Sequence, residues 1–199
     1  VQDTAEVQKA LGFEKINIYG VSYGTRLGLA YLRKYPELVR SAVLDGVAPL
    51  DIPIGSDYGE GVRNAFTRML LDCVGDQACR DAFPNLKTDF ESLEQKLIEP
   101  TPISYLNSKT SKLESETIER ENLWGVVQQM LYSPISSSML PFVINEATQD
   151  NWAPLMAWSK MGEGTFESIP IGLYLSIVCA EDIPRIEPNS TFENQMGGD

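Results

Sequence analysis

The pentapeptide Gly20-Val21-Ser22-Tyr23-Gly24 constrains the fold of this chain more than any other segment does. It directly follows residues 15–19, whose alternating pattern predicts a short β-strand, and it precedes a helical pattern that ends before Pro36. A second strand is predicted over residues 41–44. Strand, tight turn, helix and strand in this order form a βαβ unit, so the sequence predicts a parallel sheet.

The pattern Gly-x-Ser-x-Gly at such a junction has a specific physical meaning. A serine on a sharp turn between strand and helix projects its hydroxyl above the sheet, and side chains two positions before and after it would collide with their neighbours. We therefore expect Gly20 and Gly24 to be required, Ser22 to be a nucleophile, and the backbone N–H of Tyr23 to stabilise an oxyanion. The alternative is a phosphate-binding turn, but the Gly-x-Gly-x-x-Gly pattern and the lysine typical of such turns are absent.

The segments on either side of this motif are predicted to be helical. Residues 1–11 predict a helix, with Asp3 and Glu6 at the spacing of a capping box and Gly12 as its stop. After Pro49 helical patterns dominate, and they cover residues 61–71, 88–97, 120–131, 136–148 and 154–160. The polar stretch 107–119 predicts a loop or the start of an exposed helix.

These elements divide the chain into three parts. Residues 1–49 are expected to form a sheet fragment with the serine turn, residues 50–170 a helical insertion, and residues 171–199 a strand over 173–179 with a polar tail. A helical block between strands of a sheet is typical of a cap over an active site. The predicted fold class is therefore α/β, a partial parallel sheet with a mainly helical cap.

The chain contains no histidine among its 199 residues, and 28 acidic against 16 basic side chains give a formal net charge of −12. Without histidine the commonest general base is missing, and no metal or other cofactor is expected. An acidic chain without a basic cluster is a poor ligand for nucleic-acid phosphates. The apolar runs are also shorter than the roughly 20 residues of a membrane-spanning helix.

The cysteines are Cys73, Cys79 and Cys179, and they form no Cys-x-x-Cys motif. The residues between Cys73 and Cys79 include Gly75 and allow a tight turn that a disulfide would close. Such a bridge would indicate an oxidising compartment. Two buried free thiols are the alternative, and Cys179 is either a core thiol or a cysteine without its partner.

Longer segments around the serine resemble a known family. Residues 16–33 carry Tyr-Gly-Thr-Arg-Leu directly after Ser22, and residues 39–49 carry the strand end Leu-Asp-Gly-Val-Ala-Pro. These segments closely resemble the α/β-hydrolase aminopeptidases, namely the prolyl and tripeptidyl aminopeptidases, which are mostly bacterial and often secreted. The cysteine pair followed by Phe83-Pro84, and residues 176–182, extend the resemblance to residue 183.

The resemblance implies a serine hydrolase in which Ser22 attacks the carbonyl of a peptide or small ester and forms an acyl-enzyme. Members of this family release residues from free peptide N-termini, and acidic side chains of the cap hold the substrate ammonium. Glu181 and Asp182 are the candidates for that contact, because they follow the predicted strand 173–179. A solvated pair of acids at a strand end is the alternative. A secreted or periplasmic location is also implied.

The sequence departs from the family pattern on both sides. In α/β-hydrolases an acid and then a histidine follow the serine along the chain, and no strands that would carry them are recognised after Cys179. The first strands and the Gly-rich loop of the second oxyanion donor are not recognised before residue 15. We therefore expect the middle portion of a longer hydrolase, inactive or nearly so by itself. A sheet of two or three strands would expose its edges, so a homo-oligomer or swapped dimer is expected.

Two other functions remain open from the sequence. An esterase or lipase would share the serine turn, because the cap rather than the turn selects the substrate. A non-catalytic binding or scaffold protein would keep the turn without the triad.

Overall fold

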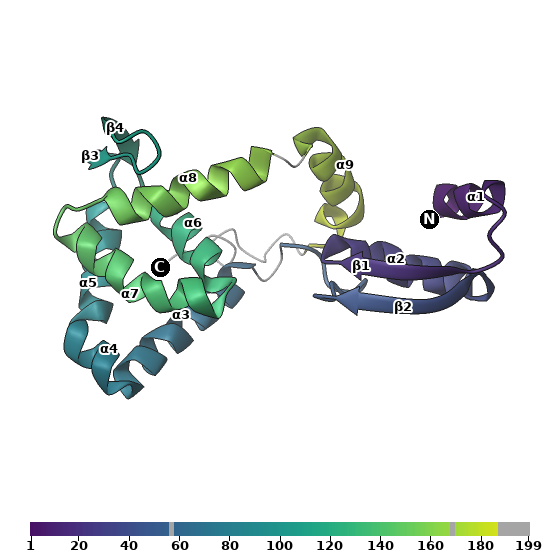
Figure 1. The fold of residues 1–199 in the computed structure, drawn as a ribbon, viewed down its shortest axis with the longest axis horizontal. Helices are drawn as coiled ribbons and strands as arrows, with labels where there is room; N and C mark the ends of the chain where they lie inside the picture. Colours follow the sequence, from purple (N-terminus) through teal and green to yellow (C-terminus); the bar gives the residue numbers. More distant parts are fainter. Residues whose placement is uncertain (56–57, 168–169, 187–199) are drawn as a thin grey trace. The chain divides into compact units, whose positions relative to one another are not determined.

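The computed structural model describes residues 1–55, 58–167 and 170–186, with the side chains of 163–167 left out. The described residues belong to two compact units (Figure 1). The first unit lies within Val1–Ser56 and Ser176–Thr191, and the second lies within Asp57–Leu175.

The first unit contains the predicted βαβ motif. Its elements are helix α1 (Gln2–Ala10), strand β1 (Ile16–Val21), helix α2 (Tyr23–Lys34), the 3-10 helix η1 (Pro36–Leu38) and strand β2 (Val39–Asp45). The two strands pair in parallel, with Gly20 opposite Leu44. The predicted parallel βαβ unit is therefore confirmed.

Helix α2 packs closely against one face of this sheet because Gly28 has no side chain. A Cβ on Gly28 would lie 3.1 Å from Leu44 Cδ2 and 3.3 Å from Ile18 Cγ2. Side chains alternate along a strand, so the strand residues next to Ile18 and Leu44 point to the opposite face of the sheet. There Tyr19 and Val43, which are paired in register, are 70% and 57% exposed. One face of the sheet therefore packs against α2, whereas the other face exposes apolar side chains among the described residues.

Helix α1 begins at Gln2, two residues before the start that an N-cap at Asp3 implies. Val1 occupies the N-cap position without a side-chain cap bond, so the capping box predicted for Asp3 and Glu6 is wrong. Both acids lie within the helix, and Glu6 instead accepts a hydrogen bond from Gln2 at 3.1 Å. The predicted stop is confirmed, since Gly12 adopts φ of 74°, the left-handed conformation that ends many helices.

The second unit is mainly helical and contains one β-hairpin. Its elements are α3 (Tyr58–Gly75), α4 (Gln77–Ala82), α5 (Leu86–Lys96), β3 (Thr101–Leu106), β4 (Leu113–Ile118), α6 (Arg120–Leu131), α7 (Pro134–Thr148), α8 (Ala153–Glu167) and the start of α9 (Ile171–Glu181). The helices predicted after Pro49 correspond to α3, α5, α6, α7 and α8, whereas the short α4 was not predicted. The rings of Phe66, Phe90 and Trp124 pack together in the core, with centroids 4.3 to 5.6 Å apart.

The hairpin β3–β4 corrects the expectation of a loop or helix start over 107–119. Ile103 and Tyr105 alternate with exposed residues and are buried. On the facing strand Glu114 and Glu116 alternate in the same way, and the Tyr105 hydroxyl lies 3.1 and 2.8 Å from their carboxylates. The polar residues of β4 therefore form a strand because a buried tyrosine pairs with them, which no periodicity of apolar residues indicates.

Residues 173–179 form helix α9, so the strand predicted there is wrong. The segment Leu173-Tyr174-Leu175-Ser176-Ile177-Val178-Cys179 is almost wholly apolar, and a short apolar run has no period that separates helix from strand. The helical bond from Asp182 N–H to the Val178 carbonyl is 3.0 Å long. Helix α9 exposes its apolar side chains, with Ile171 at 66% and Leu173 at 59%.

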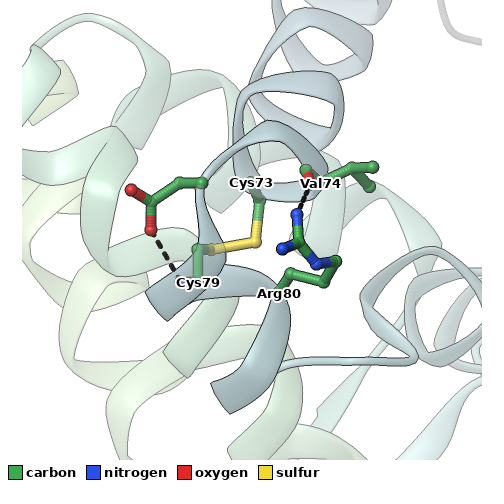
Figure 2. The surroundings of a disulfide bond; sticks show 5 residues. Cys73, Val74, Cys79 and Arg80 are labelled. Atoms are coloured by element: carbon green, nitrogen blue, oxygen red, sulfur yellow. Dashed lines mark hydrogen bonds between the residues drawn. A yellow bond between two sulfur atoms is a disulfide. The ribbon is translucent and has the colours of Figure 1, made fainter.

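The structure joins Cys73 of α3 to Cys79 of α4 in a disulfide, with Cα atoms 5.1 Å apart (Figure 2). The N-cap of α4 is Asp76, whose carboxylate accepts the N–H of Cys79 at 2.8 Å. Arg80 donates to the carbonyl of Val74 at 2.5 Å and thereby also ties α4 to α3. Cys179 is free and exposed, so the interpretation of Cys179 as a core thiol is wrong.

Candidate active site

Ser22 lies between the end of β1 and the start of α2, in a conformation that few side chains adopt. Its φ is 52° and its ψ is −121°, and it occupies the N-cap position of α2. Such angles are costly for a residue with a side chain and persist only where the surrounding structure enforces them. The Ser22 N–H donates to the carbonyl of Asp45 at 3.0 Å, which fixes the turn to the end of β2. The exposed Ser22 side chain thus stands on the sharp turn that the sequence predicts.

The two glycines of the motif play different roles in the described structure. A Cβ on Gly20 would lie 2.6 Å from the carbonyl oxygen of Gly24, so no larger residue fits at position 20 without moving the backbone. A Cβ on Gly24 would meet no described atom within 4 Å. The expected collision is therefore present at Gly20, whereas the expectation of one at Gly24 is wrong for the part of the chain that is described.

The start of α2 offers backbone donors next to the serine. Tyr23 is the first residue of α2, and the first N–H groups of a helix have no partner within it. The helix has no acid in its first turn and carries Arg33 and Lys34 in its last, so the positive end of its dipole at Ser22 is not offset. The Tyr23 N–H is therefore available for an anionic oxygen formed at Ser22.

Thr25 fastens the serine turn from within, a role the sequence did not indicate. Its hydroxyl is fully buried and donates to the Ser22 carbonyl at 2.6 Å. The same oxygen accepts the N–H of Ala48 at 2.9 Å. One threonine therefore links the serine turn to the loop after β2.

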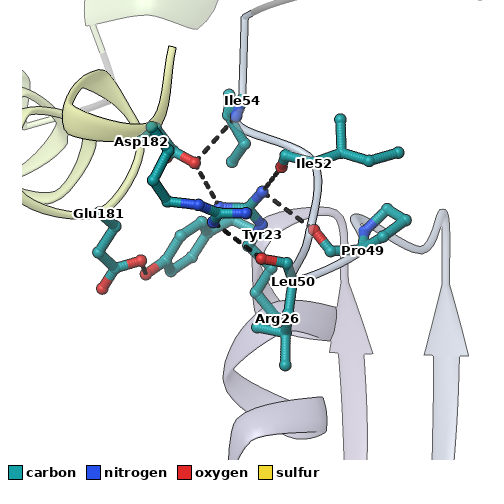
Figure 3. Close-up of polar contacts among 9 residues, drawn as sticks. Tyr23, Arg26, Pro49, Leu50, Ile52, Ile54, Glu181 and Asp182 are labelled. Atoms are coloured by element: carbon teal, nitrogen blue, oxygen red, sulfur yellow. Dashed lines mark hydrogen bonds and ion pairs between the residues drawn. The ribbon is translucent and has the colours of Figure 1, made fainter. Parts of the chain in front are cut away.

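Arg26 and Asp182 form a buried ion pair one helical turn behind the serine (Figure 3). Their side chains are 4% and 0% exposed, and Nη1 of Arg26 lies 2.7 Å from Oδ1 of Asp182. The Ile54 N–H also donates to Oδ1, at 2.9 Å. Arg26 further donates to the carbonyls of Pro49, at 3.0 Å, and Ile52. The segment 49–54 is thus held around the guanidinium.

This geometry separates the two acids that the sequence groups together. Asp182 is buried against Arg26 and does not fit the expected contact with a substrate ammonium. Glu181 is exposed, and one of its oxygens accepts a 2.9 Å hydrogen bond from the Tyr23 hydroxyl. Burial, and then the hydrogen bond and charge of Glu181, raise the pKa of Tyr23 to about 12. The Tyr23 phenol therefore stays protonated and donates to Glu181 over the physiological range.

Within residues 1–55, 58–167 and 170–186 no cluster of three or more His, Cys, Asp and Glu side chains could hold a metal ion. Over the same ranges no helix combines the length and the hydropathy of a membrane span.

Comparison with known proteins is consistent with this geometry. Residues 1–158 match the family described as alpha/beta hydrolase fold. The chain is 35% identical over 104 residues to the serine protease Hip1 of Mycobacterium tuberculosis and of Mycobacterium bovis, which is 50% of this chain and 20% of that protein. It is 28% identical over 85 residues to the putative hydrolase YuaR of Escherichia coli, or 40% of this chain and 17% of that protein. The matched segments thus span a fifth or less of these relatives.

Proposed function

The chain belongs to the α/β-hydrolase fold family, and from this membership we propose that Ser22 is the nucleophile of a serine peptidase that releases residues from free peptide N-termini. The observation that carries the proposal is the conformation of Ser22 between β1 and α2, with Gly20 allowing the turn. The similarity to a serine protease over half of the chain supports peptide rather than other acyl substrates.

In the proposed reaction Ser22 Oγ attacks the scissile carbonyl, and the developing oxyanion accepts the N–H of Tyr23. A triad of this kind needs a histidine to take the serine proton, and these 199 residues contain none. We therefore propose that the proton acceptor comes from residues outside this sequence. We propose that the 199 residues alone bind substrate and hold the nucleophile but turn over little or none.

We propose Glu181 as the ligand of the substrate ammonium. Its carboxylate is exposed and is linked through the Tyr23 hydroxyl to the residue that follows the nucleophile. A carboxylate at this position favours a substrate with a free N-terminus over an N-acylated one, because only the free amino group is protonated and carries a positive charge. Asp182 is not proposed for this contact, because its carboxylate is buried in the ion pair with Arg26.

We propose that the helical unit acts as the cap that selects substrates.

The disulfide between Cys73 and Cys79 supports an oxidising compartment, and thus secretion or a periplasmic location. The exposed face of the β1–β2 sheet, with Tyr19, Val21 and Val43, supports association through this face. Light scattering on the purified chain tests the last point, and a monomer at all concentrations contradicts it.

The nucleophile is tested by replacing the missing base with a diffusible one. The purified chain is incubated with alanine p-nitrophenyl ester, with and without added imidazole, alongside a Ser22→Ala variant. We expect no difference between the two proteins without imidazole, and a Ser22-dependent rate that grows with imidazole concentration. Equal rates at every imidazole concentration contradict the role of Ser22. Turnover of an aminoacyl-naphthylamide without imidazole, lost in Ser22→Ala, contradicts the proposed inactivity of the chain.

The ammonium site is tested with the same assay on the N-acetylated ester. We expect the free-amine ester to react faster, and Glu181→Gln to remove this preference. Glu37→Gln, at an exposed acid of η1, is the matched control and keeps the preference. Equal Ser22-dependent rates on both esters in the unmodified chain would favour an esterase instead.

A further inference from the structure

A cavity of about 450 Å³ lies where α3, the end of α4 and the start of α5 come together. This volume falls within the range of about 300–1,000 Å³ that is usual for ligand pockets. Its walls are mainly apolar and include Leu70, Leu71, Val74, Phe83 and Leu86. Leu71 and Val74 are each 61% exposed, so the cavity opens on apolar surface. All of its lining residues belong to the second unit and none contributes to the serine site.

The charge of this cavity is opposite to that of the chain. Arg80 and Lys87 line it and no acidic residue does, although the net charge of the chain is −12. Of the acids nearby, Asp72 pairs with Arg68 at 2.9 Å and Asp76 caps α4, whereas Asp81 and Asp89 do not line the cavity. Lys87 lies 3.7 Å from Glu91 in an exposed pair, which is a weak interaction. The cavity therefore favours a ligand that is both apolar and anionic.

Neutral polar groups on the wall narrow the class of ligand further. Thr67, Asn85 and Thr88 also line the cavity. Asn85 is the N-cap residue of α5, yet its side chain makes no cap hydrogen bond. Hydroxyl and amide groups can bond to a peptide unit, whereas the chain of a fatty acid offers them nothing to bond to. These groups favour a peptide over an acyl chain.

The disulfide between Cys73 and Cys79 forms part of the cavity wall. Cys73 lies in the wall of the cavity, and its partner Cys79 precedes Arg80 directly in the sequence. Figure 2 shows Arg80 beside the bridge, donating to the Val74 carbonyl. The bridge therefore holds the guanidinium at the cavity, since it fixes α4 to α3.

We propose that this cavity binds the C-terminal residue of a peptide, with its apolar side chain against Leu70, Phe83 and Leu86 and its carboxylate at Arg80 and Lys87. A C-terminal apolar residue carries both required groups within a single residue, which fits a cavity of this size. The site is separate from the serine, where the proposed substrate presents its free N-terminus.

The test uses the full 199-residue chain and an N-acetylated tetrapeptide that ends in two leucines, so that no free amine reaches the serine site. Binding is measured by isothermal titration and by amide shifts of α3 to α5. We expect the free acid to bind at least about tenfold more tightly than its C-terminal amide, because charge-assisted hydrogen bonds exceed neutral ones. Arg80→Gln is expected to weaken binding by up to about fivefold, the upper end of the range for an exposed charge pair.

Controls separate this site from general charge effects. Arg68→Gln removes an exposed arginine of the neighbouring helix α3 that does not line the cavity, and binding should be unchanged. Reduction of the disulfide should weaken binding about as much as Arg80→Gln does. Equal binding of acid and amide, equal binding by the Arg80→Gln variant, or no binding at millimolar peptide overturns the proposal. Tighter binding of dodecanoic acid, in competition with the peptide, overturns the assignment to a peptide.

Discussion

The hydroxyl of Tyr23 donates a 2.9 Å hydrogen bond to Oε2 of Glu181, 158 positions further along the chain. This bond connects the residue after the serine to the end of helix α9. It exists because α9 is a helix that ends at Glu181, so consecutive residues 181 and 182 point to different neighbours. The exposed acid reaches Tyr23, and the buried acid reaches Arg26.

This bond predicts an unusual tyrosine titration. Burial, followed by the hydrogen bond to Glu181, raises the pKa of Tyr23 to about 12, so the folded protein favours the neutral phenol. The resulting stabilisation is complete below pH 10, and it is lost as the pH rises through 12. Burial also raises the pKa values of Tyr31 and Tyr105, so the contribution of Tyr23 is measured as a difference between variants. The phenolate absorbance gained near pH 12 should fall by one tyrosine in Tyr23→Phe, and Glu181→Gln should shift that contribution downward. The control Tyr19→Phe should keep the full change near pH 12, and an undiminished change in Tyr23→Phe would contradict the assignment.

The glycines of the serine turn should tolerate alanine very differently. Gly20→Ala places a Cβ 2.6 Å from the Gly24 carbonyl oxygen, and it should lower the free energy of unfolding by about 1–3 kcal/mol or more. Gly24→Ala meets open space in the first turn of α2, so its effect should lie within about 0.5–1 kcal/mol of zero, and stabilisation is expected. Urea unfolding measures both. Equal losses in the two variants would show that a further neighbour packs on Gly24.

The buried ion pair should be costly to break but easy to replace. Arg26→Met leaves Asp182 buried without its cation, and it should lower the free energy of unfolding by about 3–5 kcal/mol. The double variant Arg26→Met with Asp182→Leu should recover most of this loss. Among the described residues Nε of Arg26 and Oδ2 of Asp182 are buried without a hydrogen-bond partner. The cost of burying these unpaired atoms offsets the attraction of the charges, so the pair contributes little net free energy of folding.

The exposed pair Arg68–Asp72 provides the control for this series. Arg68→Met should change the free energy of unfolding by about 0.5 kcal/mol or less, because solvent screens the pair. A cost for Arg26→Met that is no larger than this, or a double variant as unstable as the single one, contradicts the interpretation.

The hairpin should contribute to stability above the ordinary pKa of glutamate. Lys160 lies 2.9 Å from Glu116, and its hydrogen bond lowers the pKa of Glu116 below the usual 4.5. A lowered pKa stabilises the folded state above pH 4.5, and this contribution is lost as the pH falls through the lower value. Urea unfolding over a pH series should therefore show a shallower loss of stability in acid for both Glu116→Gln and Lys160→Met. An unchanged acid slope in both variants contradicts this prediction.

The sequence predicted the elements whose pattern is periodic and local. The βαβ unit was predicted because β1 alternates and the turn at Ser22 carries two glycines. Helices α5 to α8 were predicted because their apolar residues repeat at helical spacing. The Gly-x-Ser-x-Gly pattern at this junction predicted Ser22 as a nucleophile, and the strained backbone at Ser22 supports that interpretation.

What the sequence could not indicate depends on contacts between distant residues. Helix α9 was missed because its run of apolar residues fits helix and strand equally well. Strand β4 was missed because its carboxylates gain a partner only when Tyr105 is buried beside them. The burial of Asp182 likewise depends on Arg26, which lies 156 positions earlier.

The separation of six positions between Cys73 and Cys79 also bears on how this protein is made. A bridge within so short a stretch can close as soon as that stretch leaves the ribosome or the translocation channel, before helices α5 to α8 have emerged. Cys179 follows one hundred residues after Cys79, so it has not yet emerged to compete. Oxidation can therefore pair the correct thiols by the order of synthesis alone, without reshuffling.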